Sequence, residues 1–170
     1  MENVIIRNVR KEDIPDVVDI QISSWQTAYR GIVDDEYLDN MNKEERIEKR
    51  NKDYQNGGFI VAEMNGEIVG FSRYAFNNSF TPDVQDIDCE LLALYVKPNL
   101  KGNGIGRKMF EHVTSEFKNQ NKSKMILWCF KENYPSRKFY ERMGGTVFKE
   151  KFITFGNKYY LEISYLYDLY

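Results

Sequence analysis

Apolar and polar residues alternate along the chain with two periods, one typical of helices and one typical of strands. After Asp13-Ile-Pro, apolar residues recur every three or four positions, which predicts an amphipathic helix that ends at Gly31. The acidic segment 34–36 is typical of a helix's first turn, and a charged helix is expected through Glu44 to Lys52. Before them, Val4 to Ile6 predicts a short edge strand.

Alternating patterns in the rest of the chain predict an antiparallel sheet with one helical crossover. Two strands flank Asn65-Gly66, the preferred dipeptide of a two-residue hairpin. The expected order is a strand at Phe59–Met64, a strand at Glu67–Phe76, a polar loop at 77–86, a strand at Cys89–Val96, a helix to about Phe117, a strand at Met125–Phe130, a helix at Pro135–Met143, and strands at Gly145–Phe155 and Lys158–Asp168. We therefore expect one α+β domain over residues 1–170, with a mixed, mostly antiparallel sheet of about seven strands, a central parallel β-α-β crossover and about four flanking helices.

The turn that follows the strand ending at Val96 has the features of an anion site. It reads Lys101-Gly-Asn-Gly-Ile-Gly-Arg-Lys, and glycines at 102, 104 and 106 can adopt positive φ and let a ligand approach the backbone. The first amides of the helix that follows lack carbonyl partners. Residues 97–110 carry four basic and no acidic side chains, which adds to the positive end of the helix dipole. The turn therefore predicts a phosphate site.

Two familiar phosphate-binding loops do not match the sequence of this turn. No Gly-Lys-Ser/Thr follows the glycines, which excludes a Walker A loop, and a dinucleotide-binding Rossmann unit would have its glycines near the start of the chain. A diphosphate held mainly by backbone amides remains, which suits a ligand whose reactive end lies some distance away.

Charge and composition limit the classes of partner. Lys and Arg total 24 against 26 Asp and Glu, so nothing in the net charge of −2 favours a nucleic acid or a membrane. No apolar run is long enough to span a membrane and the first residues do not resemble a signal peptide, which predicts a cytoplasmic protein. Cys89 and Cys129 are expected as packed thiols, and no cluster has metal-ligand spacing.

Three segments, taken in order, carry a longer pattern. They are Glu90-Leu-Leu-Ala-Leu-Tyr-Val-Lys-Pro, Lys101-Gly-Asn-Gly-Ile-Gly and Asn133-Tyr-Pro-Ser-Arg-Lys-Phe-Tyr140-Glu-Arg-Met-Gly. The chain thereby resembles the GNAT superfamily of acetyl-CoA-dependent N-acetyltransferases, in their fourth strand, their Gln/Arg-x-x-Gly-x-Gly/Ala pyrophosphate loop and their Asn-x-x-Ala-x-x-Phe-Tyr-x-x-x-Gly helix. This chain departs from the pattern at Lys101, where the family has Gln or Arg, and at Gly144-Gly145, where the family has Gly-Phe.

The resemblance implies that acetyl-CoA is the co-substrate. The loop amides would hold its pyrophosphate, and residues 94–96 would offer backbone hydrogen bonds to its pantetheine arm. The cofactor-binding residues implied in this way are Leu94, Tyr95, Val96, Lys101, Gly102, Asn103, Gly104, Gly106, Arg107, Lys108, Asn133 and Tyr140.

The same resemblance assigns the chemistry. An alkyl amine is protonated near neutral pH, so a base must remove a proton, and Glu90 is the candidate, acting directly or through water. Tyr140 would protonate the departing thiolate, and the amide of Tyr95 or Val96 would stabilise the oxyanion. Direct transfer is expected because no Cys/His pairing is evident for Cys129.

Each of these residues also has a structural interpretation. Glu90 can be a surface or salt-bridged carboxylate, Tyr140 can simply pack, and Asn133 can cap the helix after it, which is compatible with cofactor contact. The single histidine, His112, is expected to be structural.

The acceptor is left open by the sequence. Polyamines, aminoglycosides, amino acids and protein N-termini all fit, and a catalytically idle CoA-binding sensor of the same fold is the alternative. A cationic amine would suit an acidic mouth, and the alternative is that these acidic residues form a solvated loop. The residues are Asp34, Asp35, Glu36, Asp83, Asp86, Asp88 and Glu90. Trp25, Tyr29 and Tyr37 can wall the pocket, although amphipathic spacing also explains Trp25 and Tyr29 as core residues. One further set of aromatic residues predicts either a homodimer surface or packing on the helices, namely Phe152, Phe155, Tyr159, Tyr160, Tyr165 and Tyr167.

Overall fold

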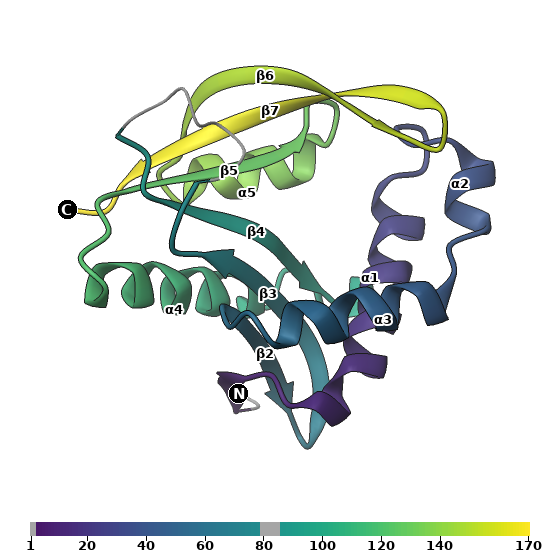
Figure 1. The fold of residues 1–170 in the computed structure, drawn as a ribbon, viewed down its shortest axis with the longest axis horizontal. Helices are drawn as coiled ribbons and strands as arrows, with labels where there is room; N and C mark the ends of the chain where they lie inside the picture. Colours follow the sequence, from purple (N-terminus) through teal and green to yellow (C-terminus); the bar gives the residue numbers. More distant parts are fainter. Residues whose placement is uncertain (1–2, 79–85) are drawn as a thin grey trace.

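The computed structural model describes residues 3–78 and 86–170, which form one sheet covered by helices (Figure 1). The strands are β1 (Val4–Asn8), β2 (Phe59–Met64), β3 (Glu67–Ala75), β4 (Cys89–Val96), β5 (Lys124–Phe130), β6 (Thr146–Phe155) and β7 (Lys158–Asp168). The α-helices are α1 (Ile14–Ala28), α2 (Asp35–Asp39), α3 (Lys43–Tyr54), α4 (Ile105–Asn119) and α5 (Tyr134–Arg142). The expected strands and helices are all present to within a few residues. The described residues contain five α-helices where about four were expected.

The seven strands lie in the order β1-β2-β3-β4-β5-β7-β6. Neighbours are antiparallel except β4 and β5, which are parallel and joined through α4. This confirms the predicted mixed sheet with one crossover. One feature was not predicted, which is that β7 lies between β5 and β6.

The parallel pair β4 and β5 is joined over a short stretch only. The ladder runs from Cys89 opposite Met125 to Leu91 opposite Leu127 and stops there. Beyond it, β4 continues along β3 as far as Val96, while β5 continues along β7 as far as Phe130. The two strands therefore diverge in the middle of the sheet.

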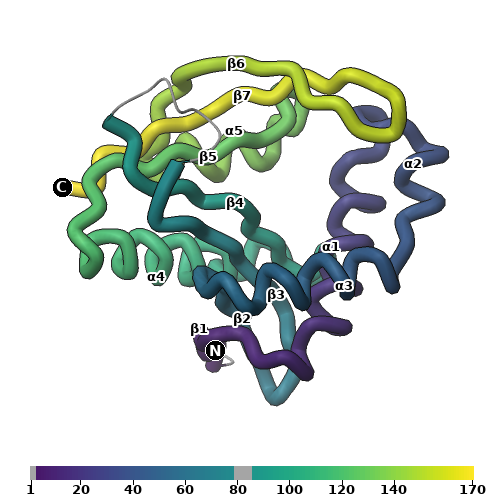
Figure 2. The backbone as a smooth tube through the Cα atoms, in the orientation of Figure 1, coloured from purple at the N-terminus to yellow at the C-terminus, as the bar shows by residue number. Residues whose placement is uncertain are grey.

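Helices cover both faces of the sheet and give each its own core. On one face, α4 and α5 pack on a cluster that includes Met109, Phe117 and the fully buried Tyr165. On the other, α1 packs on Phe71 and its neighbours, and a second cluster joins α1 and α2 to Phe130 and the β6–β7 hairpin. The turn of that hairpin reaches α2, far from both chain ends (Figure 2).

Two expectations about the chain as a whole can be compared with this fold. No helix in the described part of the chain is both long and apolar enough to cross a membrane. Cys89 lies buried in β4 and Cys129 partly buried in β5, and both thiols are free, as predicted.

Candidate active site

A cavity of about 920 Å³ opens where β4 and β5 diverge. Residues from α4 and α5 line it on one face of the sheet, and residues from α1, β6 and β7 line it on the other. Because the ladder between β4 and β5 ends at Leu91, the cavity connects the two faces through the sheet. A ligand bound there can therefore present one end to each face.

The glycine turn forms one end of this cavity. Gly102 and Gly104 have φ of +84° and +80°, the left-handed region that favours glycine, and Gly104 is the N-cap of α4. A Cβ on either glycine would meet nothing within 4 Å, so the space beside the turn is open. The first turn of α4 carries no acidic residue, and Lys101 and Arg107 line the cavity. The turn thus combines free helix amides with positive charge, as predicted for a phosphate site.

Gly106 does not have the positive φ that the sequence suggested. It lies within α4, and a Cβ there would sit 3.6 Å from Phe139 and 3.7 Å from Leu94, at ordinary contact distances. The reason for the difference is that the helix begins at Ile105, so that only the first two glycines belong to the turn. Gly106 contributes by leaving the cavity wall without a side chain.

Most of the predicted cofactor residues line the cavity, and two do not. The lining residues among them are Leu94, Tyr95, Val96, Lys101, Gly102, Gly104, Gly106, Arg107, Asn133 and Tyr140. The side-chain amide of Asn103 instead donates a hydrogen bond to the carbonyl of Leu100 at 3.0 Å, which stabilises the turn. Lys108 is exposed and lies outside the cavity. Part of the charge of Arg107 is shared with Glu111, at 2.8 Å.

Three phenol side chains from different elements converge in the cavity. Tyr95 accepts a hydrogen bond from Trp25 Nε1 at 3.0 Å and lies 3.5 Å, oxygen to oxygen, from Tyr29. Tyr140 faces the same group from α5, and burial raises its pKa well above the usual value, with Cys129 and Tyr95 contributing. A phenol with a raised pKa keeps its proton at neutral pH and can donate it.

The thiol of Cys129 lies beside these tyrosines. Burial raises its pKa to about 12. The thiol therefore stays protonated at neutral pH, which makes it a poor nucleophile.

Buried hydrogen bonds fix the helix that carries Tyr140. The Asn133 side chain caps α5 by accepting from the amide of Ser136 at 3.4 Å, as its structural interpretation predicted. The Tyr167 hydroxyl donates to the carbonyl of Tyr140 at 2.7 Å. A Cβ on Gly145 would lie 2.6 Å from that hydroxyl, which explains why glycine replaces the usual phenylalanine there.

Glu90 is deeply buried on β4, on the face that α1 covers. Its side chain is 4% exposed, and its Oε1 has no hydrogen-bond partner among the described residues. Burial raises its pKa to about 7; Lys151 opposes this shift and Glu162 adds to it. The carboxylate does not line the cavity itself. A pKa near neutrality suits a base, but a proton must reach Glu90 through an intermediate group or water.

Glu162 is a cavity residue that the sequence analysis missed. It lies on β7 between Phe130 of β5 and Lys151 of β6, and it is the one acidic side chain among the described lining residues. Burial raises its pKa, and Lys151 opposes this. The available signal was a single charged residue within the largely apolar strand segment Tyr-Leu-Glu-Ile-Ser-Tyr.

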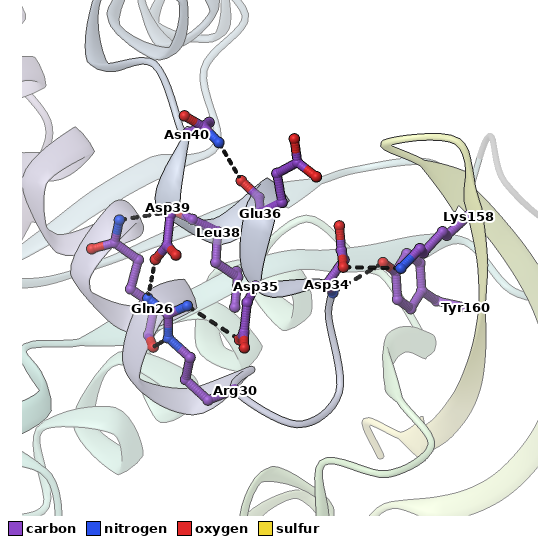
Figure 3. Close-up of polar contacts among 10 residues, drawn as sticks. All are labelled: Gln26, Arg30, Asp34, Asp35, Glu36, Leu38, Asp39, Asn40, Lys158 and Tyr160. Atoms are coloured by element: carbon purple, nitrogen blue, oxygen red, sulfur yellow. Dashed lines mark hydrogen bonds and ion pairs between the residues drawn. The ribbon is translucent and has the colours of Figure 1, made fainter.

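The other proposed acidic residues do not form a mouth to the cavity. Asp34 pairs with Lys158 at 2.9 Å and Asp35 with Arg30 at 3.2 Å (Figure 3). Asp88 accepts hydrogen bonds from the amides at 123 and 124 and so holds the start of β5. None of these lines the cavity, nor do the exposed residues Glu36 and Asp86. Asp83 lies outside the described residues.

The aromatic candidates divide between the cavity and the surface. Trp25 and Tyr29 line the cavity while packing in the core beside it, and Tyr37 does not line it. Of the six aromatic residues proposed as a dimer surface, four pack inward, and only Phe152 and Tyr159, 71% and 76% exposed, face solvent. Packing on the helices thus accounts for most of the set, and the dimer stays a prediction.

Two further expectations concern metals and the single histidine. No group of three or more metal-binding side chains occurs in residues 3–78 and 86–170. His112 lies on α4 and does not line the cavity.

The sequence profile of the acetyltransferase (GNAT) family matches residues 17–145. The chain belongs to the GNAT family. It is 28% identical over 138 residues to the uncharacterized N-acetyltransferase YuaI of Bacillus subtilis (strain 168), covering 81% of this chain and 78% of that one. It is 24% identical over 145 residues to a spermidine N(1)-acetyltransferase of Thermoplasma acidophilum, covering 84% and 88%.

A solved relative has the same fold. The crystal structure of PaiA N-acetyltransferase from Thermoplasma acidophilum in complex with coenzyme A superposes with a TM-score of 0.72 at 22% identity, covering 94% of this chain and 98% of that one. This GNAT protein is accordingly an acetyl-CoA-dependent acetyltransferase.

Proposed function

We propose that residues 1–170 form a single N-acetyltransferase domain that moves the acetyl group of acetyl-CoA directly to a primary amine. The observation that carries this proposal is the cavity through the sheet, with an anion-binding turn at one end and a protonated tyrosine beside the point where β4 and β5 diverge. This arrangement suits a long ligand with a diphosphate at one end and a reacting group at the other.

The cavity fits acetyl-CoA at each part of that ligand. The open space beside Gly102 and Gly104 and the uncapped amides of α4 would receive the pyrophosphate. The edge of β4 from Leu94 to Val96, which β5 leaves unpaired, would bind the pantetheine arm. When bound, acetyl-CoA supplies an activated acetyl group on a thiol leaving group.

The tyrosine and the loop residues would then complete the transfer. The neutral amine nitrogen forms a bond to the carbonyl carbon and releases one proton to water while the carbon–sulfur bond breaks. The Tyr140 hydroxyl gives its proton to the sulfur and regains one from that water. The amide of Tyr95 or Val96 donates to the carbonyl oxygen as charge builds there. The high pKa of Cys129 argues against an acyl-cysteine pathway.

Glu90 would act as the base through an intermediate group. Its pKa of about 7 lets it accept a proton near neutral pH. Because it does not line the cavity, the ammonium proton must pass through water or through Glu162, which interacts with it electrostatically. Base catalysis of this kind contributes about 10²–10⁴-fold to the rate.

An assay of free thiol release with a broad panel of amines tests the proposal. Acetyl-CoA should stabilise the protein against heat whether or not it is an enzyme, since any ligand of the native state does so. Acceptor-dependent thiol release is expected only of the enzyme. Thermal stabilisation without release for any amine would contradict the proposal and favour the CoA-binding sensor.

A further inference from the structure

The half of the cavity that faces α1 and the β6–β7 hairpin is walled by aromatic rings. Trp25, Tyr29, Phe130 and Phe155 all line it. Their centroids lie 4.8 Å apart for Tyr29 and Phe130 and 5.7 Å apart for Trp25 and Phe155, in edge-to-face contacts that fix each ring against its neighbours. This wall is opposite the side that the glycine turn and α5 line, so it faces whatever molecule receives the acetyl group.

One negative charge lies within this half of the cavity. Glu162 is the single acidic side chain among the described lining residues. It lies opposite Phe130, the residue that follows Cys129 on β5, and Cys129 and Tyr140 line the same cavity. The carboxylate is therefore close to the proposed reaction centre.

Two cations contact aromatic rings that line the cavity, one on Trp25 of the wall and one on Trp128. The guanidinium carbon of Arg46 lies 5.7 Å from the ring centre of Trp25, and the Lys151 ammonium lies 4.1 Å from that of Trp128. Neither of these cations lines the cavity. The extra ammonium groups of a polycationic ligand would lose water against aromatic rings, with no second carboxylate among the described lining residues. The charges favour a ligand with a single ammonium group.

We propose, building on the acetyltransferase function above, that the acceptor is a primary amine with one positive charge and a flat apolar body, of the arylalkylamine class. Glu162 binds its ammonium group beside the thioester, and the rings of Trp25, Phe130 and Phe155 hold its body. This selects one class from the several that the sequence left open, and it sets the chain apart from its relative that acts on spermidine.

Three amines test this assignment with the purified protein. Thiol release is measured with 2-phenylethylamine, with n-butylamine, which has one charge and no ring, and with spermidine, which has several charges. We expect kcat/KM to be at least about tenfold higher for 2-phenylethylamine than for spermidine, because spermidine lacks the aromatic contacts and its extra ammonium groups would lose water without a counter-charge. A higher value for spermidine would overturn the substrate class while leaving the acetyltransferase function intact. Turnover of no amine in this or the broader panel would instead contradict that function.

The charge contact is tested by Glu162→Gln, with Glu150→Gln as its control. Glu150 lies on β6, exposed and paired with Lys131 outside the cavity. We expect Glu162→Gln to lower kcat/KM for both monoamines about 10- to 100-fold, with unchanged affinity for coenzyme A by calorimetry, and Glu150→Gln to change neither. Unchanged kcat/KM in a folded Glu162→Gln variant would overturn the ammonium site.

The aromatic wall is tested by Phe155→Leu against Phe152→Leu on the same strand. Phe155 lines the cavity, whereas Phe152 is 71% exposed. Phe155→Leu should lower kcat/KM for 2-phenylethylamine about 2- to 10-fold while leaving n-butylamine nearly unchanged, and Phe152→Leu should affect neither. An equal loss for both amines would show a general packing effect and contradict the proposed ring site.

Discussion

Replacing Glu90 with glutamine should make the protein more stable and less active, and the gain in stability should depend on pH. The side chain is 4% exposed, and burial raises its pKa from 4.5 to about 7. A tenfold change in the acid dissociation constant corresponds to about 1.4 kcal/mol, so holding this group ionised at high pH disfavours the folded state by about 3 kcal/mol.

The sign follows from proton binding. Between about pH 4.5 and 7 the folded protein holds the Glu90 proton and the unfolded chain does not, so wild-type stability falls as pH rises through that window. Glutamine has no charge and lacks this dependence. The difference in unfolding free energy between Glu90→Gln and wild type should therefore be near zero at about pH 4.5 and level off at about 3 kcal/mol above about pH 7.

Urea denaturation of both proteins at intervals from about pH 4.5 to about pH 8.5 measures this difference. In a thermal scan at about pH 8 the same free energy corresponds to a melting temperature about 6–12 °C higher for the variant. Glu132→Gln, at an exposed site, is the control and should give no pH-dependent difference. A Glu90→Gln variant that is less stable than wild type at this pH, or equally stable at every pH, would refute the argument that Glu90 is held charged at a cost.

The activity of the same variant completes the test. Loss of the base should flatten the acidic limb of the pH–rate profile, with recovery at high pH where free amine is abundant. Higher stability together with this altered profile would show that the buried charge is retained for catalysis.

Three other predictions use the same assays. Tyr140→Phe keeps the ring and removes the proton donor, so kcat should fall about 100-fold with unchanged affinity for acetyl-CoA; an unaltered kcat would leave the acid to water. Gly104→Ala places a side chain at φ +80° and should cost about 1–2 kcal/mol of stability. Gly106→Ala lies within the helix, so it should be neutral or stabilising by up to about 1 kcal/mol, but it should weaken coenzyme A binding because its Cβ reaches the cavity wall. Equal effects of the two variants on stability would contradict the helix start at Ile105. Burial opposes ionisation of Asp13, but hydrogen bonds from Arg7 outweigh this effect and lower the pKa of the carboxyl group. Asp13→Asn should therefore lower the free energy of unfolding by about 1–3 kcal/mol at neutral pH, and by less as pH falls below about 4. Urea denaturation across this pH range measures the difference.

The sequence predicted the elements well because their signals are local. The Asn65-Gly66 hairpin and the glycine turn before α4 each depend on a few adjacent residues, and both form as expected. The assignment of Gly106 to the turn was wrong, because a helix can begin one residue earlier or later without changing its apolar pattern.

The acceptor side of the cavity was harder to predict because it depends on strand order. Glu162 lies beside Phe130 only because β7 inserts between β5 and β6, and no local pattern encodes that insertion. The pairing of Asp34 with Lys158 joins residues more than a hundred positions apart, so the acidic segment looked free in the sequence although its first residue is paired in the fold. Residues brought together by topology are those that periodicity cannot identify.

The short ladder between β4 and β5 divides the sheet into two parts, which are joined by three residue pairs, by α4 and by the side-chain clusters on both faces. Strands β1 to β4 form one part and β5 to β7 the other, and each part has a complete set of antiparallel partners of its own. A ligand lying along the edge of β4 that β5 leaves unpaired would take the place of a strand, and it would then stiffen the sheet as well as supply the group to be transferred.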